Sequence, residues 1–131
     1  MNILCDLGLD GRDIRLIGNL YWNQRAAVRV DGQLSEEVSI MKGVRQGCIL
    51  SPLLFNIYSE KIFQDALDGK SQGVVVNGSI INNIRYADDT VILATSMDDL
   101  QTLLDSISEE SNAMGLHLNV KKKKWMVDRR N

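Results

Sequence analysis

Two dipeptides in the sequence, Asp31-Gly32 and Asn77-Gly78, are strong signals for chain reversal. Asp-Gly and Asn-Gly favour the two-residue turns that join paired antiparallel strands, because both central positions of such a turn need a positive φ. Segments that are suited to strands flank each dipeptide, and they are residues 25–30, 38–41, 74–76 and 79–81. The chain is therefore expected to contain two β-hairpins.

Three segments have the apolar spacing of helices, one before the first hairpin, one between the two hairpins and one after the second. Residues 10–23 form the first, with Asp10 as its N-cap. The second starts with Ser51 as N-cap, is expected to end near Gly69, and is apolar around most of its circumference, which predicts burial. The third follows Ser96, which forms a capping box with Asp99, and Gly115 closes it.

The remaining segments complete an α+β fold. Strands are expected at residues 84–87, 91–94 and 116–120, and near 125–127. Hairpins mixed with helices predict an antiparallel sheet that is covered by helices on one face. At 131 residues the chain has the length of a single domain.

Composition excludes several classes of protein. The sequence contains no apolar run of the about 18 residues that a membrane helix needs, and its start lacks the basic region of a signal peptide. Cys5 and Cys48 are too few for a disulfide scaffold or an all-cysteine zinc site. Cys48 is expected to be a small buried side chain. These features predict an intracellular protein that is not secreted and has no membrane partner.

Charge is distributed unevenly along the chain. Residues 1–120 have a formal balance of −7 and residues 121–131 a balance of +5, which gives the net charge of −2. The basic cluster begins with the four lysines at 121–124, and such a cluster either contacts phosphates or is a solvated tail. The acidic body argues against a dedicated DNA-binding module, which is usually basic throughout.

Asp88 and Asp89 are adjacent between the two predicted strands 84–87 and 91–94. Adjacent carboxylates repel each other, and a hard divalent cation such as Mg²⁺ relieves that repulsion because it prefers oxygen ligands. A pair of such ions promotes phosphoryl transfer by stabilising the attacking and leaving oxygens. From the residues alone, the pair is either a metal site or a polar turn in which Thr90 makes a local hydrogen bond.

Three ordered motifs resemble the reverse transcriptases of non-LTR (LINE-type) retrotransposons. Tyr86-Ala87-Asp88-Asp89 resembles the catalytic motif of that family. Residues 43–56, GVRQGCILSPLLFN, resemble its glycine-glutamine-glycine loop and the following helix. Residues 115–119, followed by Lys122, resemble the segment after the catalytic hairpin. Together with residues 7–30, the resemblance covers nearly the whole chain.

The resemblance implies a polymerase palm that uses Mg²⁺. Asp88 would be the metal-binding catalytic carboxylate, and Asp89 would be the second, less critical one beside it. Tyr86 would pack near the primer terminus and the incoming nucleotide. The implied partners are an RNA template, a DNA primer and deoxynucleoside triphosphates.

The resemblance also implies contacts outside the aspartate motif. Gln46 and Gly47 would lie along the nucleotide pocket and the template, where glycine permits a close backbone approach. Arg45 would reach a phosphate, or else be simply solvated, and Lys122 would approach the phosphates of the nucleotide. Lys123 stands where the family usually has threonine.

One carboxylate of the family set is missing from the sequence. It belongs to an upstream motif with the setting Ala-Phe-Asp, and Asp6, Asp10 and Asp13 lack the apolar strand that precedes it. We therefore expect residues 1–131 to form one partial domain, palm with part of the fingers, that lacks the first catalytic strand and most of the fingers. The expected function is that of an RNA-directed DNA polymerase fragment that is catalytically incomplete on its own, with a second polymerase fragment as a further candidate partner.

Two alternatives remain open at this stage. One is a domesticated fragment that binds nucleic acid without catalysis, for which binding would weaken steeply with salt and would not depend on Asp88. The other is a relic without a selected function, in which missing strands leave sheet edges and apolar faces exposed.

Overall fold

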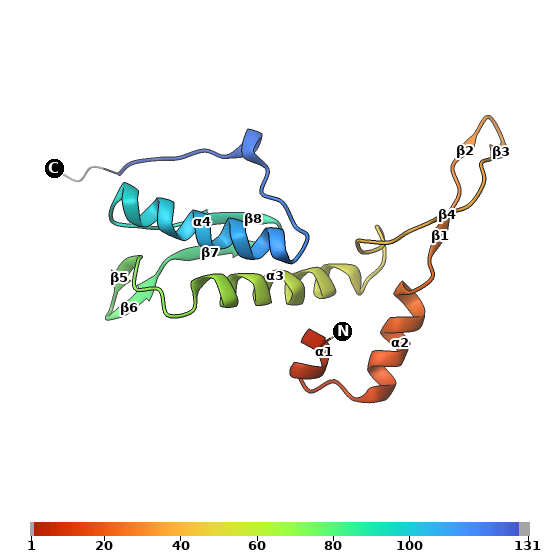
Figure 1. Ribbon diagram of the computed structural model, residues 1–131, viewed down its shortest axis with the longest axis horizontal. Coiled ribbons are helices and arrows are strands. Elements are labelled where there is room, and N and C mark those ends of the chain that lie inside the picture. Colours follow the sequence, from red (N-terminus) through yellow and green to blue (C-terminus); the bar gives the residue numbers. More distant parts are fainter. Residues whose placement is uncertain (1, 129–131) are drawn as a thin grey trace. The chain divides into compact units, whose positions relative to one another are not determined.

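The computed structural model describes residues 2–128, which combine helices with short antiparallel strands (Figure 1). The chain divides into two compact units, Met1–Lys61 and Ile62–Asn131. The described part of the first unit contains α1 (Asn2–Asp6), α2 (Gly11–Tyr21), the strands β1 to β4 and the start of α3 (Ser51–Leu67). The described part of the second unit contains the end of α3, the strands β5 to β8, α4 (Met97–Ala113) and the 3-10 helix η1 (Val120–Lys122).

The predicted α+β class is confirmed. None of the helices described is both long enough and apolar enough to cross a membrane.

The start of α2 is capped as the sequence predicts. Oδ1 of Asp10 accepts hydrogen bonds from the backbone N–H groups of Arg12 at 2.7 Å and Asp13 at 2.9 Å. At the other end, the amide of Trp22 donates to the carbonyl of Gly18 at 2.8 Å. A Cβ on Gly18 would clash with the Trp22 ring, so only glycine lets the ring lie this close to the helix.

The hairpin predicted around Asp31-Gly32 is present and is divided into two ladders. β2 (Arg29–Val30) pairs with β3 (Gln33–Leu34), and β1 (Arg25–Ala26) pairs with β4 (Val38–Ser39). The φ angles of Asp31 and Gly32 are +49° and +81°, which are the signs of a type I′ turn.

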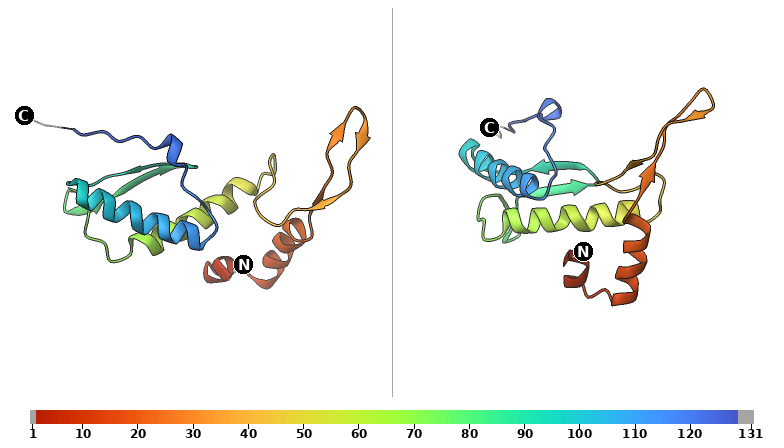
Figure 2. Two further views of the ribbon diagram at one scale, coloured as in Figure 1. Left: turned by 45° about the horizontal axis from the view of Figure 1, so that its top comes forward. Right: turned by 45° about the vertical axis from the view of Figure 1, so that its right-hand side comes forward.

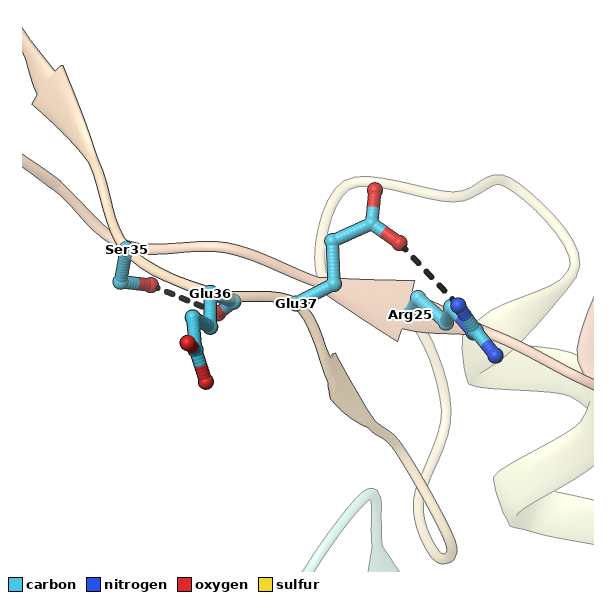
Figure 3. A network of polar contacts seen from close by, with 4 residues as sticks. All are labelled: Arg25, Ser35, Glu36 and Glu37. Carbon is cyan, nitrogen blue, oxygen red and sulfur yellow. Dashed lines mark hydrogen bonds and ion pairs between the residues drawn. The ribbon is translucent and has the colours of Figure 1, made fainter.

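A local mismatch in residue number separates the two ladders. Residues 35–37 lie opposite residues 27–28, so one strand has an extra residue, as in a β-bulge. Oγ of Ser35 accepts from the Val28 amide at 2.9 Å and donates to the Glu36 carbonyl at 2.9 Å. Beside it, Nη1 of Arg25 lies 3.5 Å from Oε2 of Glu37, and both side chains are largely exposed (Figure 3). At the interruption, the Ser35 side chain thus bonds to the Val28 amide while the Ser35 amide still donates to the Val28 carbonyl at 2.9 Å.

The start of α3 differs from the prediction by one residue. The carbonyl of Leu50 accepts the first helical hydrogen bond, from the Leu54 amide at 3.0 Å, so Leu50 rather than Ser51 holds the cap position. The Ser51 hydroxyl instead donates to the carbonyl of Arg45 at 2.5 Å. The prediction of Ser51 as the cap is wrong because the Ser51 hydroxyl forms its hydrogen bond with the preceding loop.

The C-terminal end of α3 agrees with the prediction, and its burial agrees only in part. The helix stops at Leu67, and Gly69 follows with a φ of +65°. Ile62 and Ala66 are buried, whereas Leu53 remains 56% exposed. Apolar residues around a whole helix are all buried only when neighbours cover every side, and α3 does not have that cover.

The second unit contains the other predicted hairpin and a well-capped helix. β5 (Val74–Val76) pairs with β6 (Ser79–Ile81) across Asn77-Gly78, whose φ angles are +50° and +81°. α4 follows Ser96, whose Oγ accepts from the Asp99 amide at 3.1 Å and donates to Oδ2 of Asp99 at 2.7 Å. The predicted type I′ turn and the Ser96–Asp99 pairing are both confirmed.

A small apolar core lies under one face of α4. Leu103 and Ile107, one helical turn apart, are 0% and 2% exposed, and Ile62 is 1% exposed. α4 contacts β8 (Asp89–Ile92), and the views show the helix running alongside the β7–β8 hairpin (Figures 1 and 2). This packing supports the strand that carries one of the two adjacent aspartates.

Two expectations about strands are corrected. The strands within residues 2–128 form four separate two-stranded ladders instead of one sheet. The strands expected at 116–120 and 125–127 are absent from the described residues, where Val120–Lys122 is a 3-10 helix and the rest is irregular. A strand needs a partner ladder, and the adjoining lysines at 121–124 repel one another, so alternating apolar residues do not suffice here.

Candidate functional site

The β7–β8 hairpin presents the adjacent aspartates at its tip. β7 (Asn83–Tyr86) pairs with β8 (Asp89–Ile92), with Tyr86 opposite Asp89, so that Ala87 and Asp88 form the two-residue turn. Ala87 has a φ of +53°, whereas Asp88 does not have a positive φ, which is the sign pattern of a type II′ turn. The turn gives Asp88 the outermost position, and Asp89 is the first residue of the returning strand.

The two faces of this hairpin differ in their surroundings. Residues directly opposite each other in an antiparallel pair share a face, so Tyr86 lies on the same face as Asp89 and Arg85 on the same face as Thr90. The guanidinium of Arg85 lies 4.7 Å from the ring centroid of Phe63, a cation–π contact that places its face against α3. Tyr86 is 84% exposed, and the face it shares with Asp89 is open to solvent.

The carboxylates of Asp88 and Asp89 are exposed and lack a counter-charge from the part of the chain that the structure describes. Among the described residues, no Lys, Arg or His side chain forms an ion pair with either of them. The same residues contain no group of three or more His, Cys, Asp or Glu side chains that could hold a metal ion. Mg²⁺ is commonly bound by one or two carboxylates together with substrate phosphates and water. The pair therefore fits Mg²⁺ as a partial ligand set that needs oxygen ligands from a bound nucleotide or from further protein.

The loop that precedes α3 contains the second group of predicted site residues. Gln46 and Gly47 form an exposed turn, and Gly47 has a φ of +80°, which explains the glycine. The Cys48 amide donates to the Arg45 carbonyl at 3.3 Å, and the Ser51 amide donates to the Cys48 carbonyl at 3.1 Å. These bonds close residues 45–51 into a compact loop, with the Arg45 side chain exposed at its start.

Lys122 lies in the second unit, in the 3-10 helix η1, where its amide donates to the carbonyl of Asn119 at 3.1 Å. Its side chain is exposed, as are those of the neighbouring lysines at 121–124. The structure thus groups Tyr86, Asp88 and Asp89 on one hairpin of the second unit. It groups Arg45, Gln46 and Gly47 on one loop of the first unit.

A polar cluster around Cys48 is absent from the sequence-based prediction. The Tyr21 hydroxyl lies 2.8 Å from Oγ of Ser51 and donates to Sγ of Cys48 at 3.3 Å. The hydrogen bond from Tyr21, followed by one from the Leu50 amide, lowers the pKa of the Cys48 thiol below its ordinary value. The same contact with Cys48 is the main reason that the pKa of Tyr21 is raised. Cys48 is half-buried and polar in its contacts, so the expectation of a small buried hydrophobic side chain is wrong.

No sequence signal could have indicated this cluster. Tyr21 has the apolar spacing of α2, and 27 residues separate it from Cys48. Such a contact depends on how the chain folds back and not on any local pattern.

The chain is similar to known proteins of one family. The family model described as reverse transcriptase (RNA-dependent DNA polymerase) matches residues 6–131. The retrovirus-related Pol polyprotein from the type-2 retrotransposable element R2DM of Drosophila melanogaster is 34% identical over 106 residues, which are 81% of this chain and 10% of that protein. The RNA-directed DNA polymerase from the mobile element jockey of Drosophila funebris is 27% identical over 109 residues, 82% of this chain and 12% of that protein. The chain spans about a tenth of the length of these relatives.

Proposed function

This chain belongs to the reverse transcriptase (RNA-dependent DNA polymerase) family, and we propose that it supplies the metal-binding hairpin and the nucleotide loop of a retrotransposon RNA-directed DNA polymerase. The observation that carries the proposal is the Asp88–Asp89 pair, exposed at a hairpin tip without a protein counter-charge in the described residues. Like charges held together in this way favour a bound cation. The pair also lies inside the matched residues 6–131.

The proposed chemistry assigns distinct work to the hairpin residues. Asp88 and Asp89 would hold Mg²⁺, which would supply charge stabilisation for the attacking and leaving oxygens of nucleotide transfer. Tyr86 lies on the open face of the hairpin, next to Asp89 in register, and packs against the primer terminus and the incoming nucleotide. α4, which contacts β8 from one side, acts as a covering helix of the palm.

The loop and the basic segment contribute contacts with nucleotide and template. Gln46 and Gly47 lie along the nucleotide pocket and the RNA template, and the exposed Arg45 guanidinium binds a phosphate. Lys122 approaches the phosphates of the deoxynucleoside triphosphate. The DNA primer is the remaining partner of the proposed site.

Two carboxylates alone do not form the complete catalytic set. The described residues contain no third carboxylate close enough to complete a metal-binding group. We therefore expect the 131-residue chain by itself to show no extension of a primed RNA template with Mg²⁺ or Mn²⁺. A second polymerase fragment that provides the upstream carboxylate is the partner that would complete the site.

Mn²⁺ binding tests the proposed metal role without requiring catalysis. Electron paramagnetic resonance of Mn²⁺ and dATP should show more bound ion with the chain than with dATP alone, and Asp88→Asn should reduce this difference. The matched control is Asp98→Asn, because Asp98 and Asp99 are also adjacent and Asp99 already accepts a hydrogen bond from Ser96 at 2.7 Å. Equal Mn²⁺ binding by the unsubstituted chain and the Asp88→Asn variant would contradict the proposal.

A second candidate function is binding of nucleic acid without catalysis, and the basic segment favours it. The four lysines at 121–124 are exposed, and Trp125, 75% exposed, follows directly. Exposed cations beside an aromatic ring combine phosphate attraction with base stacking. Binding of this kind would be unchanged by Asp88→Asn, which separates the two functions.

A further inference from the structure

The Gln46-Gly47 turn lies in a loop that is held closed by hydrogen bonds to a single backbone carbonyl. The carbonyl oxygen of Arg45 accepts two hydrogen bonds, from the Cys48 amide at 3.3 Å and from the Ser51 hydroxyl at 2.5 Å. Since Gln46 is exposed and Gly47 has no side chain, no side-chain packing of these two residues fixes the turn. The position of the turn therefore depends on the hydrogen bonds at its base.

Ser51 is the central group of that base. Ser51 is 6% exposed. Its hydroxyl has a single proton, and the short hydrogen bond to the Arg45 carbonyl uses that proton. Oγ of Ser51 consequently faces the Tyr21 hydroxyl, 2.8 Å away, as an acceptor. The Tyr21 proton is then shared between Oγ of Ser51 and Sγ of Cys48, which lies 3.3 Å from the phenolic oxygen.

This chain of bonds links a helix to a loop that is distant in sequence. Tyr21 is the last residue of α2, and it precedes Ser51 by 30 residues. Among the described residues of α2, the Tyr21 hydroxyl forms hydrogen bonds with both Cys48 and Ser51, the residues on either side of the loop's closing turn. We propose that Tyr21 is a positioning residue, which holds the Arg45–Ser51 loop so that Gln46 and Gly47 meet the nucleotide.

The nucleotide-binding role of Gln46 and Gly47 rests on the proposed function. The contact of Tyr21 with Cys48 and Ser51 does not depend on it. Tyr21 touches no reacting atom, and it acts on the nucleotide only through Ser51 and the Arg45 carbonyl. Without its hydroxyl, Oγ of Ser51 loses the Tyr21 donor, and Sγ of Cys48 loses one donor while the Leu50 amide remains. A buried serine hydroxyl that loses this partner weakens the whole network, because hydrogen bonds in a chain polarise one another.

The pKa of the Cys48 thiol reports on the hydrogen bond from Tyr21, and a purely structural role of Tyr21 would not change this pKa. The hydrogen bond from Tyr21 lowers the pKa of this thiol, so the thiolate is more populated near neutral pH than in a chain without that bond. The pH profile of iodoacetamide alkylation at Cys48, followed by mass spectrometry, reads this bond directly. Cys5, which is exposed and outside the network, is the reference thiol in the same molecule.

The test compares the intact chain with its Tyr21→Phe variant, which retains the ring and removes only the hydroxyl. We expect alkylation of Cys48 at pH 7 to slow relative to Cys5. We also expect exchange of the Cys48 and Ser51 amides to rise about fivefold, the factor that a hydrogen bond of typical net strength represents. Ser51→Ala should have the same effect on exchange. Ser59→Ala, which removes an exposed hydroxyl bonded to the Asn56 carbonyl, should have none.

The outcomes separate the inference from the proposed function. Unchanged loop exchange and an unchanged alkylation profile in Tyr21→Phe would overturn the positioning role. Faster loop exchange together with weaker dATP binding would support it in full. If the unsubstituted chain binds no dATP, the nucleotide role of the loop fails, while the exchange and alkylation data still report whether Tyr21 holds the loop.

Discussion

Leu103→Ala is the substitution for which the structure predicts the largest loss of stability. Leu103 is 0% exposed on α4, and the described residues contain only four other buried apolar side chains, those of Leu4, Ile62, Ala66 and Ile107. The substitution deletes about three methylene equivalents at about 0.8 kcal/mol each. The cavity left behind raises the expected loss to about 3 kcal/mol.

A loss of this size would be a large part of the total, because domains of this length are stable by about 5–15 kcal/mol and a small core favours the lower end. Urea unfolding followed by far-UV circular dichroism is the suitable assay. With a slope of about 2 kcal/mol per M, the midpoint should fall by about 1.5 M. The control is Leu53→Ala, since Leu53 is 56% exposed. The reasoning is refuted if both variants lose the same stability, or if Leu103→Ala loses less than about 1 kcal/mol.

Three further predictions concern the α4 cap, the β5–β6 hairpin and the basic segment. Ser96→Ala should cost about 1 kcal/mol in urea unfolding because it removes the cap of α4, whereas Ser106→Ala in mid-helix should cost less than half as much; equal losses would contradict the capping role. Gly73→Ala should disrupt the β5–β6 hairpin in NMR spectra, because a Cβ there would meet the Ile81 carbonyl oxygen at 2.9 Å. Gly78→Ala has open space and should cost about 1 kcal/mol for its φ of +81°; a milder effect of Gly73→Ala would refute the packing argument. Replacing the lysines at 121–124 with glutamine should weaken RNA binding and flatten its salt dependence in fluorescence anisotropy; unchanged binding would show that the segment is solvated.

Much of the fold could be read from local sequence because the deciding interactions span a few residues. Asp31-Gly32 and Asn77-Gly78 set their turns by their own φ preferences, and the Ser96–Asp99 pairing lies within one helical turn. Asp10 caps α2 for the same reason. In each case, the residues that decide the structure are nearest neighbours along the chain.

The features that could not be predicted depend on contacts between distant residues. Ser51 looked like a helix cap, but its hydroxyl binds the Arg45 carbonyl, and Tyr21 bonds to it from 30 residues away. The segment 116–120 has strand-like alternation and no partner to pair with in the described chain. A local pattern cannot indicate whether a partner strand is available.

The candidate site likewise has one part that the sequence predicts correctly and another part whose role is not yet tested. The strand pattern of the sequence placed Asp88 and Asp89 between two strands, and the structure has them at the turn and first strand position of a hairpin. Their role in metal binding, and those of Gln46, Gly47 and Lys122 in nucleotide binding, stay predictions.

The measurement that tests the central claim most directly is primer extension by a chimera. Residues 6–131 of this chain would replace the matching segment in the R2DM Pol polyprotein of Drosophila melanogaster, to which the chain is 34% identical over 106 residues. We predict template-dependent DNA synthesis that falls to background with Asp88→Asn and persists with Asp98→Asn. Synthesis that is unaffected by Asp88→Asn, or a folded, RNA-binding chimera with no synthesis at all, would contradict the proposed role of the hairpin.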